Sequence, residues 1–210
     1  MFKRLMLIAV LAVLPAWAET PTAPEGFKAL FNGADLTGWT VTGDAKVWGV
    51  EKGSIFVEKG GGGYIMTDAE YGDFEFTAEY KLSKGANSGI ALRAPLKGDP
   101  AYQGMEIQLI DDEGWPSKLE TWQHTGSIYN VVPAKKQANK PIGEWNKIHI
   151  TCKGPKVTVV LNGESLVDTD LSELKIDPKK HPGAANTKGH VGFQSYNTRV
   201  EFKNVFLKGL

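Results

Sequence analysis

The stretch DFEFTAEYKL, residues 73–82, decides the fold class of this chain. Every second side chain in it is apolar, and the side chains between them are polar or charged. A period of two over ten residues is the pattern of a strand with one face buried and the other in water, as in an antiparallel sheet. We therefore start from a β-strand and look for its partners.

Two further segments repeat this pattern. Ile148, Ile150 and Cys152 alternate with polar residues over 147–152. Residues 157–161 lead into Asn162-Gly163 and a second apolar pair, and Asn-Gly between apolar strands is the strongest short hairpin signal. We expect a hairpin there.

The rest of the chain completes an all-β reading. Residues 190–194 and 200–207 are expected to form a closing pair of strands, and residues 171–176 have room for one helical turn. The 24 glycines and 11 prolines fall mostly between these segments, where turns need them. Many short strands with frequent turns predict a two-sheet antiparallel β-sandwich or jelly roll, in one domain over residues 26–210.

The N-terminus has the pattern of a secretory signal peptide. Lys3 and Arg4 precede an apolar run over 5–14, and Ala16-Trp17-Ala18 follows as a cleavage pattern. The alternative is a membrane anchor, but a bilayer core needs about 20 apolar residues and this run is half that length. We expect a signal peptide over 1–18, a leader over 19–25, and a mature protein that is periplasmic or secreted and has no membrane span.

Charge and cysteine content narrow the choice of function. The formal net charge is +0, so electrostatics gives no reason to expect nucleic acid as a partner. Cys152 is the one cysteine in the sequence, which rules out a disulfide within the chain. Since it shares the phase of Ile148 and Ile150, we interpret it as a buried small apolar residue rather than a nucleophile.

Strand alternation also predicts a polar outer face. The side chains that alternate with the core set on three strands should point outward together: Gly89, Ala91 and Arg93, then Glu106 and Gln108, then His190, Gly192 and Gln194. Aromatic residues that can cover the apolar face of a sugar lie in or near the following loops: Tyr102, Trp115, Trp122 and Tyr129. Hydrogen-bonding groups beside small residues and aromatic rings favour a cleft for a polyhydroxylated ligand, although each aromatic alone would equally fit packing.

Several ordered motifs resemble one protein family. They are FKALFNGADLTGW at 27–39, NSGIALR at 87–93, YQGMEIQLID at 102–111, HTGSIY at 124–129, GEWNKIHITCKGPKVTVVLNG at 143–163, GHVGFQS at 189–195 and VEFKNVFLK at 200–208. Together they resemble the 3-keto-disaccharide hydrolase domain family, across nearly the whole mature chain. The resemblance implies a concanavalin A-like lectin/glucanase jelly roll and an activity on sugars oxidised at carbon 3. One departure is Tyr196, where members of this family often have histidine.

A 3-keto sugar offers a particular route to cleavage. Its carbonyl acidifies the hydrogen on carbon 2, so a base can form an enediolate and the glycosidic oxygen can then leave. Glu106 is the candidate base, with a salt bridge to Arg93 as the alternative or additional role. Arg93 is the candidate donor to the enolate oxygen, and His124 is the candidate acid, unless it is only a solvated or capping residue.

The remaining candidates would bind substrate. Gln108, Gln194 and Tyr129 would position hydroxyl groups, together with Asn87 and Trp122, while Asp111 either assists or forms a turn with Asp112. No metal ligand is assigned, but a divalent cation stays open, because Glu106, Asp111 and His124 have suitable donor atoms.

Two other functions stay open. The fold hosts non-catalytic carbohydrate-binding modules as readily as enzymes, and a structural domain on an exported surface is the third reading. Laminarinases of this fold carry two glutamates with an aspartate between them on one strand, whereas this chain has Glu106, Gln108 and Ile110 there. That difference argues against an ordinary two-carboxylate glycosidase.

Overall fold

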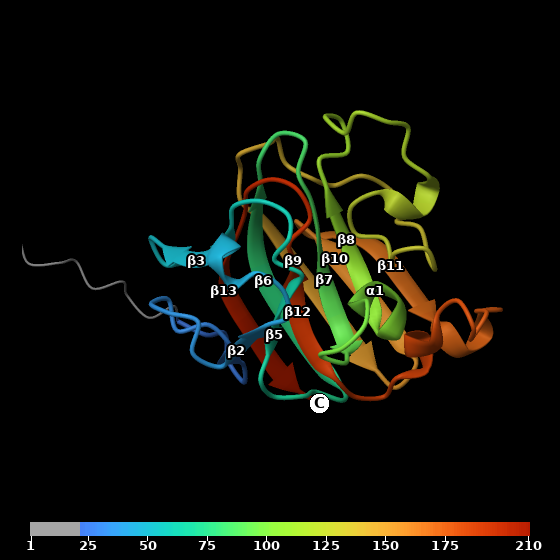
Figure 1. Cartoon of the computed structure of the whole chain (residues 1–210). Helices are drawn as coiled ribbons and strands as arrows, with labels where there is room; N and C mark the ends of the chain where they lie inside the picture. The colour runs from blue at the N-terminus through green and yellow to red at the C-terminus, as the bar shows by residue number, and fades with distance from the viewer. Residues whose placement is uncertain (1–21) are drawn as a thin grey trace, which may run out of the picture.

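The computed structural model describes residues 22–210, which fold as two antiparallel β-sheets packed face to face (Figure 1). This confirms the predicted two-sheet sandwich. The predicted signal peptide over 1–18 and the start of the leader lie outside the described residues. Within the described part, no helix is both long enough and apolar enough to cross a bilayer.

The large sheet has the strand order β11-β10-β9-β6-β13-β4-β3, and β1 pairs with β13. Its strands are β1 (Lys28–Ala29), β3 (Trp48–Glu51), β4 (Ser54–Val57), β6 (Phe74–Leu82), β9 (Asn146–Lys153), β10 (Lys156–Leu161), β11 (Glu164–Asp170) and β13 (Val200–Gly209). The small sheet has the order β2-β5-β12-β7-β8. Its strands are β2 (Trp39–Val41), β5 (Tyr64–Thr67), β7 (Asn87–Ala94), β8 (Met105–Ile110) and β12 (His190–Gln194).

The predicted strand at 73–82 lies in the large sheet between β9 and β13. It begins at Phe74, and its alternate side chains, which are those predicted to be apolar and inward, are all buried in the core between the sheets. Ile148, Ile150 and Cys152 of β9 are buried in the same core. Cys152 is therefore the buried apolar residue that its phase predicted.

The predicted hairpin is formed by β10 and β11. Leu161 pairs with Glu164, and the two residues between them have positive φ, 53° for Asn162 and 89° for Gly163. Positive φ at both positions is the requirement of the tight hairpin turn that Asn-Gly favours. The predicted turn at 171–176 is the 3-10 helix Leu171–Glu173.

The expected pairing of 190–194 with 200–207 is wrong. Strand β12 pairs with β5 and β7 in the small sheet, whereas β13 pairs with β4 and β6 in the large one. The two strands face each other across the core, where the rings of Phe193 and Phe202 stack with centroids 3.9 Å apart. Alternation shows which side chains are buried, but it does not show which sheet a strand joins.

One face of the small sheet packs on the core, and the other is partly covered by loops. The short helix α1 (Pro100–Gln103) packs against β7 and β8 on this outer face, and it lies close to β8 in Figure 1. Tyr64, Met66, Ala91 and Ala94 form a second small apolar cluster, separate from the core. The outer face of the small sheet is therefore sheltered from water in part, and the candidate site lies there.

Candidate active site

A pocket of about 200 Å³ lies on the outer face of the small sheet. Four of its side chains are polar groups from the strands: Asn87, Glu106, Gln108 and Gln194. Its other walls come from α1 and the loops, and they include Asp99, Tyr102, Trp115, Gln123, Tyr129 and Tyr196. We call this the Glu106 pocket. It brings together five of the nine predicted site residues, namely Asn87, Glu106, Gln108, Tyr129 and Gln194.

Glu106 lies on the floor of this pocket, and its side chain is only 2% exposed. It is on β8, opposite Ala91 of β7, and its carboxyl group lies over Gly89. A Cβ added to Gly89 would be 2.3 Å from Cδ of Glu106, which is far inside van der Waals contact. The absence of a side chain at Gly89 is thus what makes room for the carboxyl group.

Two side chains from neighbouring strands hold one oxygen of this carboxyl group. The hydroxyl of Tyr64 donates to Oε2 of Glu106, and Nε2 of Gln194 donates to the same oxygen at 3.0 Å. Gln194 also donates to the Tyr64 hydroxyl at 2.7 Å, which closes a triangle of polar groups. Among residues 22–210, Oε1 of Glu106 has no hydrogen-bonding partner, so that oxygen is free to take up a proton.

The environment of Glu106 changes its acidity. Burial raises the pKa of its carboxyl group to about 8, the hydrogen bond from Tyr64 opposes the rise, and the negative charge of Asp99 adds to it. Burial and the adjacent Glu106 raise the pKa of the Tyr64 phenol, so Tyr64 stays protonated and acts as a donor. A carboxyl group that titrates near neutral pH suits a general base.

The neighbouring amides are also paired. Nε2 of Gln108 donates to Oδ1 of Asn87 at 3.0 Å, and both residues line the pocket. The backbone amide of Asn87 donates in turn to Oδ1 of Asn197 at 2.8 Å. This pair presents fixed amide groups beside Glu106, which is an arrangement that suits recognition of hydroxyl groups.

An aromatic wall stands along the other side of the pocket. Tyr129 is held by its backbone amide, which donates to the carbonyl oxygen of Glu106 at 2.8 Å. Its ring packs edge-on against Tyr102, at 6.3 Å between centroids, and against Trp122, at 5.0 Å. Burial and the nearby Tyr102 raise the pKa of the Tyr129 phenol, which therefore remains a proton donor at neutral pH.

A second, wider hollow of about 600 Å³ adjoins the Glu106 pocket. The two share three lining residues, Asp99, Gln194 and Tyr196. We call it the adjoining pocket. The two pockets therefore adjoin at these three residues.

Comparison with known proteins identifies the family. The family model described as "3-keto-alpha-glucoside-1,2-lyase-like domain" matches residues 26–208. The chain belongs to this family. A 3-keto-disaccharide hydrolase from Bacteroides thetaiotaomicron is 30% identical over 236 aligned positions, which cover 91% of this chain and 81% of the relative. The resemblance seen in the sequence motifs is thereby confirmed.

Solved structures support the same assignment. A protein of Parabacteroides distasonis, provisionally named a glycosyl hydrolase, superposes with a TM-score of 0.77 at 31% identity, over 89% of this chain and 94% of that one. The endo-β-1,3(4)-glucanase SCLam of family GH16 superposes with a TM-score of 0.55 at 14% identity, over 90% of this chain and 93% of that one. The second likeness concerns the fold alone, and it confirms the concanavalin A-like architecture.

Arg93 does not share the pocket with Glu106, contrary to the prediction for this strand. Two residues of β7, Leu92 and Arg93, lie opposite the single Val191 of β12, and Arg93 has a φ of 49°. This bulge reverses the alternation, so that Ala94 joins Ala91 in the outer cluster and Arg93 turns away from it. This one bulge explains why the predicted direction of the Arg93 side chain was wrong.

Arg93 has a structural role instead. It is 2% exposed, and it donates to the carbonyl oxygens of Gly72 at 2.8 Å and Gly154 at 2.7 Å. It also forms an ion pair with Asp73 at 2.9 Å. These partners lie at the start of β6 and in the turn after β9, so Arg93 ties the small sheet to the large one. The alternative role predicted for Glu106, a salt bridge to Arg93, is therefore not formed.

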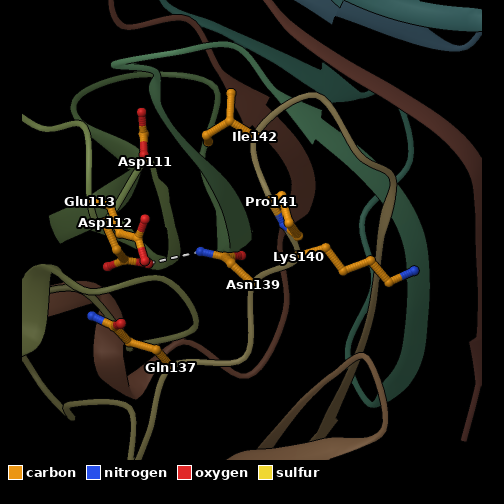
Figure 2. Close-up of a pocket in the computed structure, with 8 residues that line it drawn as sticks. All are labelled: Asp111, Asp112, Glu113, Gln137, Asn139, Lys140, Pro141 and Ile142. Atoms are coloured by element: carbon orange, nitrogen blue, oxygen red, sulfur yellow. Dashed lines mark hydrogen bonds between the residues drawn. The ribbon is translucent and has the colours of Figure 1, made fainter.

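His124 and Asp111 also lie outside the Glu106 pocket. Nδ1 of His124 contacts Oδ1 of Asp112 at 2.8 Å, and Oδ2 of Asp112 accepts a hydrogen bond from Asn139, which is the dashed line in Figure 2. Asp111 accepts from the backbone amides of Gly85 at 2.7 Å and Gly114 at 2.9 Å. Asp111 thus has the turn role that the sequence left open as an alternative, whereas His124 is paired with the side chain of Asp112.

Figure 2 shows the separate pocket that Asp111 and Asp112 border. It has a volume of about 390 Å³ and is lined by Asp111, Asp112, Glu113, Gln137, Asn139, Lys140, Pro141 and Ile142. Asp111 comes directly after the end of β8 at Ile110. Its carboxyl group therefore belongs to the loop rather than to the face that Glu106 shares.

The possible metal ligands are not gathered in one place. Within residues 22–210, no group of three or more histidine, cysteine, aspartate or glutamate side chains is arranged to hold a metal ion. Of the three candidates with suitable donor atoms, Glu106 lines the Glu106 pocket, Asp111 lines the pocket of Figure 2, and His124 contacts Asp112 without lining either pocket. Trp122, predicted to contact substrate, packs behind Tyr129 and does not line the pocket itself.

Tyr64 and Asp99 contribute to the site but were missed in the sequence, and Tyr196 was noted there only as a departure from the family pattern. Tyr64 is on β5, whose four residues are all buried, so this strand carries no alternation from which to assign its faces. Asp99 is the N-cap of α1, accepting from the amide of Ala101 at 3.0 Å. An Asp-Pro pair signals such a helix start, but it does not show that the helix covers the pocket. Tyr196 lies in a loop and has no periodic signal.

Proposed function

We propose that this protein is a carbohydrate-active enzyme that cleaves glycosidic bonds of 3-keto-glycosides, including 3-keto-disaccharides. The observation that carries the proposal is Glu106, a carboxyl group buried on the floor of a polar pocket, with one oxygen held and its pKa raised to about 8. Membership of the 3-keto-alpha-glucoside-1,2-lyase-like family and the name of the Bacteroides relative support the choice of substrate.

The first step of the proposed reaction is removal of a proton. The carboxylate of Glu106 takes the hydrogen from carbon 2, and the electron pair of that bond enters an enediolate with the carbonyl at carbon 3. An electrophile must stabilise the developing oxyanion. With Arg93 turned away, the phenol of Tyr129 takes this role, because it lies in the same pocket and remains protonated.

The second step breaks the glycosidic bond. The enediolate collapses to restore the ketone, a double bond forms between carbons 1 and 2, and the bond from carbon 1 to the glycosidic oxygen breaks. The proton held by Glu106 passes to the departing oxygen. His124, which is paired with Asp112 outside the pocket, has no part in this step.

Addition of water completes net hydrolysis. Glu106, again a carboxylate, takes a proton from water while the hydroxide adds to carbon 1. Glu106 then delivers this water-derived proton to carbon 2. Glu106 carries out every proton transfer, acting in turn as base and as acid, so the scheme requires no second carboxylate. Gln108 and Ile110, at the positions where a laminarinase would have its aspartate and second glutamate, fit this single-carboxylate scheme.

We also propose that the protein is exported, on the basis of the charged, apolar and small-residue segments in residues 1–18. Mass spectrometry of the protein recovered from a cell envelope or medium fraction tests this. Export predicts a mature N-terminus at Glu19, and a chain that retains Met1 in the cytoplasm would contradict it.

The enzymatic proposal is tested with Glu106→Gln. This substitution retains the shape and removes the base, so turnover of a 3-keto-disaccharide should fall by at least about a hundredfold. Binding of the same sugar to the variant, measured by calorimetry, should persist. If the normal protein binds sugar without cleaving it, and Glu106→Gln alters only affinity, the protein is a carbohydrate-binding module.

A further inference from the structure

The aromatic wall of the Glu106 pocket rests on a third ring that is not part of the pocket. Tyr102 and Tyr129 line the pocket, and the imidazole of His181 stacks on the ring of Tyr102, with centroids 5.1 Å apart and 27° between the planes. His181 is only 7% exposed, and it lines a different hollow of about 310 Å³. His181 therefore supports the wall without reaching the space where a sugar would lie.

A second contact of His181 reaches the turn that follows Tyr129. Nδ2 of Asn130 lies 3.2 Å from Nε2 of His181, and burial lowers the pKa of the imidazole, so the neutral ring can accept this amide hydrogen. Asn130 has a φ of 55°, in the left-handed region that non-glycine residues seldom adopt. The turn is closed by the amide of Val132, which donates to the carbonyl oxygen of Ile128 at 2.9 Å. His181 thus holds the tip of the turn next to Tyr129.

The segment that carries His181 is fixed against α1. His181 is the N-terminal cap residue of a short 3-10 helix, Pro182–Ala185, which packs against α1. A Cβ on Gly183 would lie 2.0 Å from the carbonyl carbon of Gln103, so this close approach requires glycine. Nδ2 of Asn186 donates to the carbonyl oxygen of Gln103 at 2.7 Å. The two segments are therefore joined on the same helix that carries the stacked tyrosine.

The other nitrogen of His181 shows that packing alone does not explain this residue. Nδ1 is buried and has no hydrogen-bonding partner among residues 22–210. A buried polar atom without a partner costs free energy. A phenyl ring could make the same stack without that cost, so the contact of Nε2 with Asn130 is what distinguishes histidine at this position.

We infer that His181 is a positioning residue for the reaction. It holds Tyr102 by stacking and the turn after Tyr129 through Asn130, and it thereby fixes the phenol of Tyr129 where the oxyanion forms. The inference rests on the proposed function, in which Tyr129 donates to that oxyanion. Since a displacement of about 1 Å can cost about a hundredfold in rate, a support outside the pocket is enough to control the reaction.

The first test is the turnover of a 3-keto-disaccharide by His181→Ala. The kcat should fall about tenfold and KM should stay within about twofold, because the donor acts on charge that develops only in the transition state. His181→Phe keeps the stack and loses the contact with Asn130, so its kcat should lie between those of His181→Ala and the normal protein. Leu171→Ala is the matched control, because Leu171 is a buried residue of the same hollow. It should lower the unfolding free energy in urea and leave kcat of the folded protein unchanged.

A double-mutant cycle distinguishes positioning from general loosening of the structure. In the Tyr129→Phe background the phenol is already absent, so adding His181→Ala should lower kcat by no more than about twofold. A full tenfold loss in that background would overturn the inference. An equal loss of kcat in Leu171→Ala would also overturn it, because the loss would then follow from any damage to the hollow.

NMR of the protein with ¹³C-labelled tyrosine rings gives a reading that does not depend on turnover. In both His181→Ala and His181→Phe the ring signals of Tyr129 should shift, whereas those of Tyr80, buried in the core between the sheets, should not. Signals of Tyr129 that stay in place would overturn the inference. Absence of turnover by the normal protein would refute the proposed function, and the ring signals would still decide whether His181 positions Tyr129.

Discussion

Replacing Glu106 by glutamine should make the stability of the protein less dependent on pH. The carboxyl group is buried, and its pKa in the folded protein is raised from an ordinary 4.5 to about 8. The folded protein thus holds this proton more tightly than the unfolded chain does. The stabilisation that the proton on Glu106 gives the folded state is fully present below pH 4.5. It decreases as the pH rises, and above about pH 8 it no longer changes.

The size of the effect follows from the two pKa values. Each pH unit between them costs about 1.4 kcal/mol, so the normal protein should lose about 3 kcal/mol of unfolding free energy between pH 5 and pH 8 through this one group. Glutamine has no proton to lose. The difference in unfolding free energy between Glu106→Gln and the normal protein should therefore move by about the same amount in favour of the variant over that range.

Urea unfolding at several pH values from 5 to 8 measures this difference. Glu113→Gln provides the control, since Glu113 is an exposed carboxylate in a loop, and its difference should stay within about 0.5 kcal/mol throughout. A difference for Glu106→Gln that stays constant with pH would refute the reasoning. It would mean that Glu106 titrates in the folded protein as it does in water, and its suitability as a base near neutral pH would lose its physical basis.

Four further outcomes are expected. The rate constant kcat/KM for a 3-keto-disaccharide should rise with pH and level off above about pH 8, as Glu106 becomes a carboxylate; a profile that is flat from pH 6 to 9 would contradict this. Tyr64→Phe removes a hydrogen bond that lowers the pKa of Glu106, so the rising limb of that profile should shift to higher pH, whereas an acid shift would be inconsistent with the donor role. Gly89→Ala should displace the carboxyl group of Glu106 and reduce kcat by about a hundredfold, while the circular dichroism spectrum is retained. Full activity would show that the close approach of Glu106 to Gly89 is unimportant. Arg93→Ala should lower the unfolding free energy, measured by urea titration, by about 2–3 kcal/mol, because Arg93 loses its buried hydrogen bonds and ion pair. The kcat of the folded variant should stay nearly normal. Loss of kcat without loss of stability would show that Arg93 is a catalytic group.

The features of the fold that could be predicted are those with local causes. The alternation at 73–82 and the Asn162-Gly163 turn each depend on residues adjacent in sequence, and both predictions are confirmed. Pairing of β12 depends on long-range contacts with β5 and β7. No local pattern specifies those contacts, which is why the expected partner was wrong.

The candidate site was predictable to the extent that strands remain regular. Alternation placed Glu106 and Gln108 on one face, and Gln194 joined them from another strand. It failed at Arg93, where one extra residue in β7 reverses the direction of the side chain. His124 was chosen for its chemistry alone, and a loop residue has no periodicity that shows which pocket it faces.

The central claim is that cleavage proceeds by proton abstraction at carbon 2, and NMR analysis of products formed in D₂O tests it most directly. The protein would be incubated with a 3-keto-disaccharide and with its unoxidised parent, with Glu106→Gln and an enzyme-free sample as controls for spontaneous exchange. The account predicts cleavage of the keto sugar only, with deuterium at carbon 2 of the released 3-keto sugar at the first measurable time, or an unsaturated product before water adds. Cleavage that leaves the original hydrogen on carbon 2, or equal cleavage of the unoxidised parent, would contradict it.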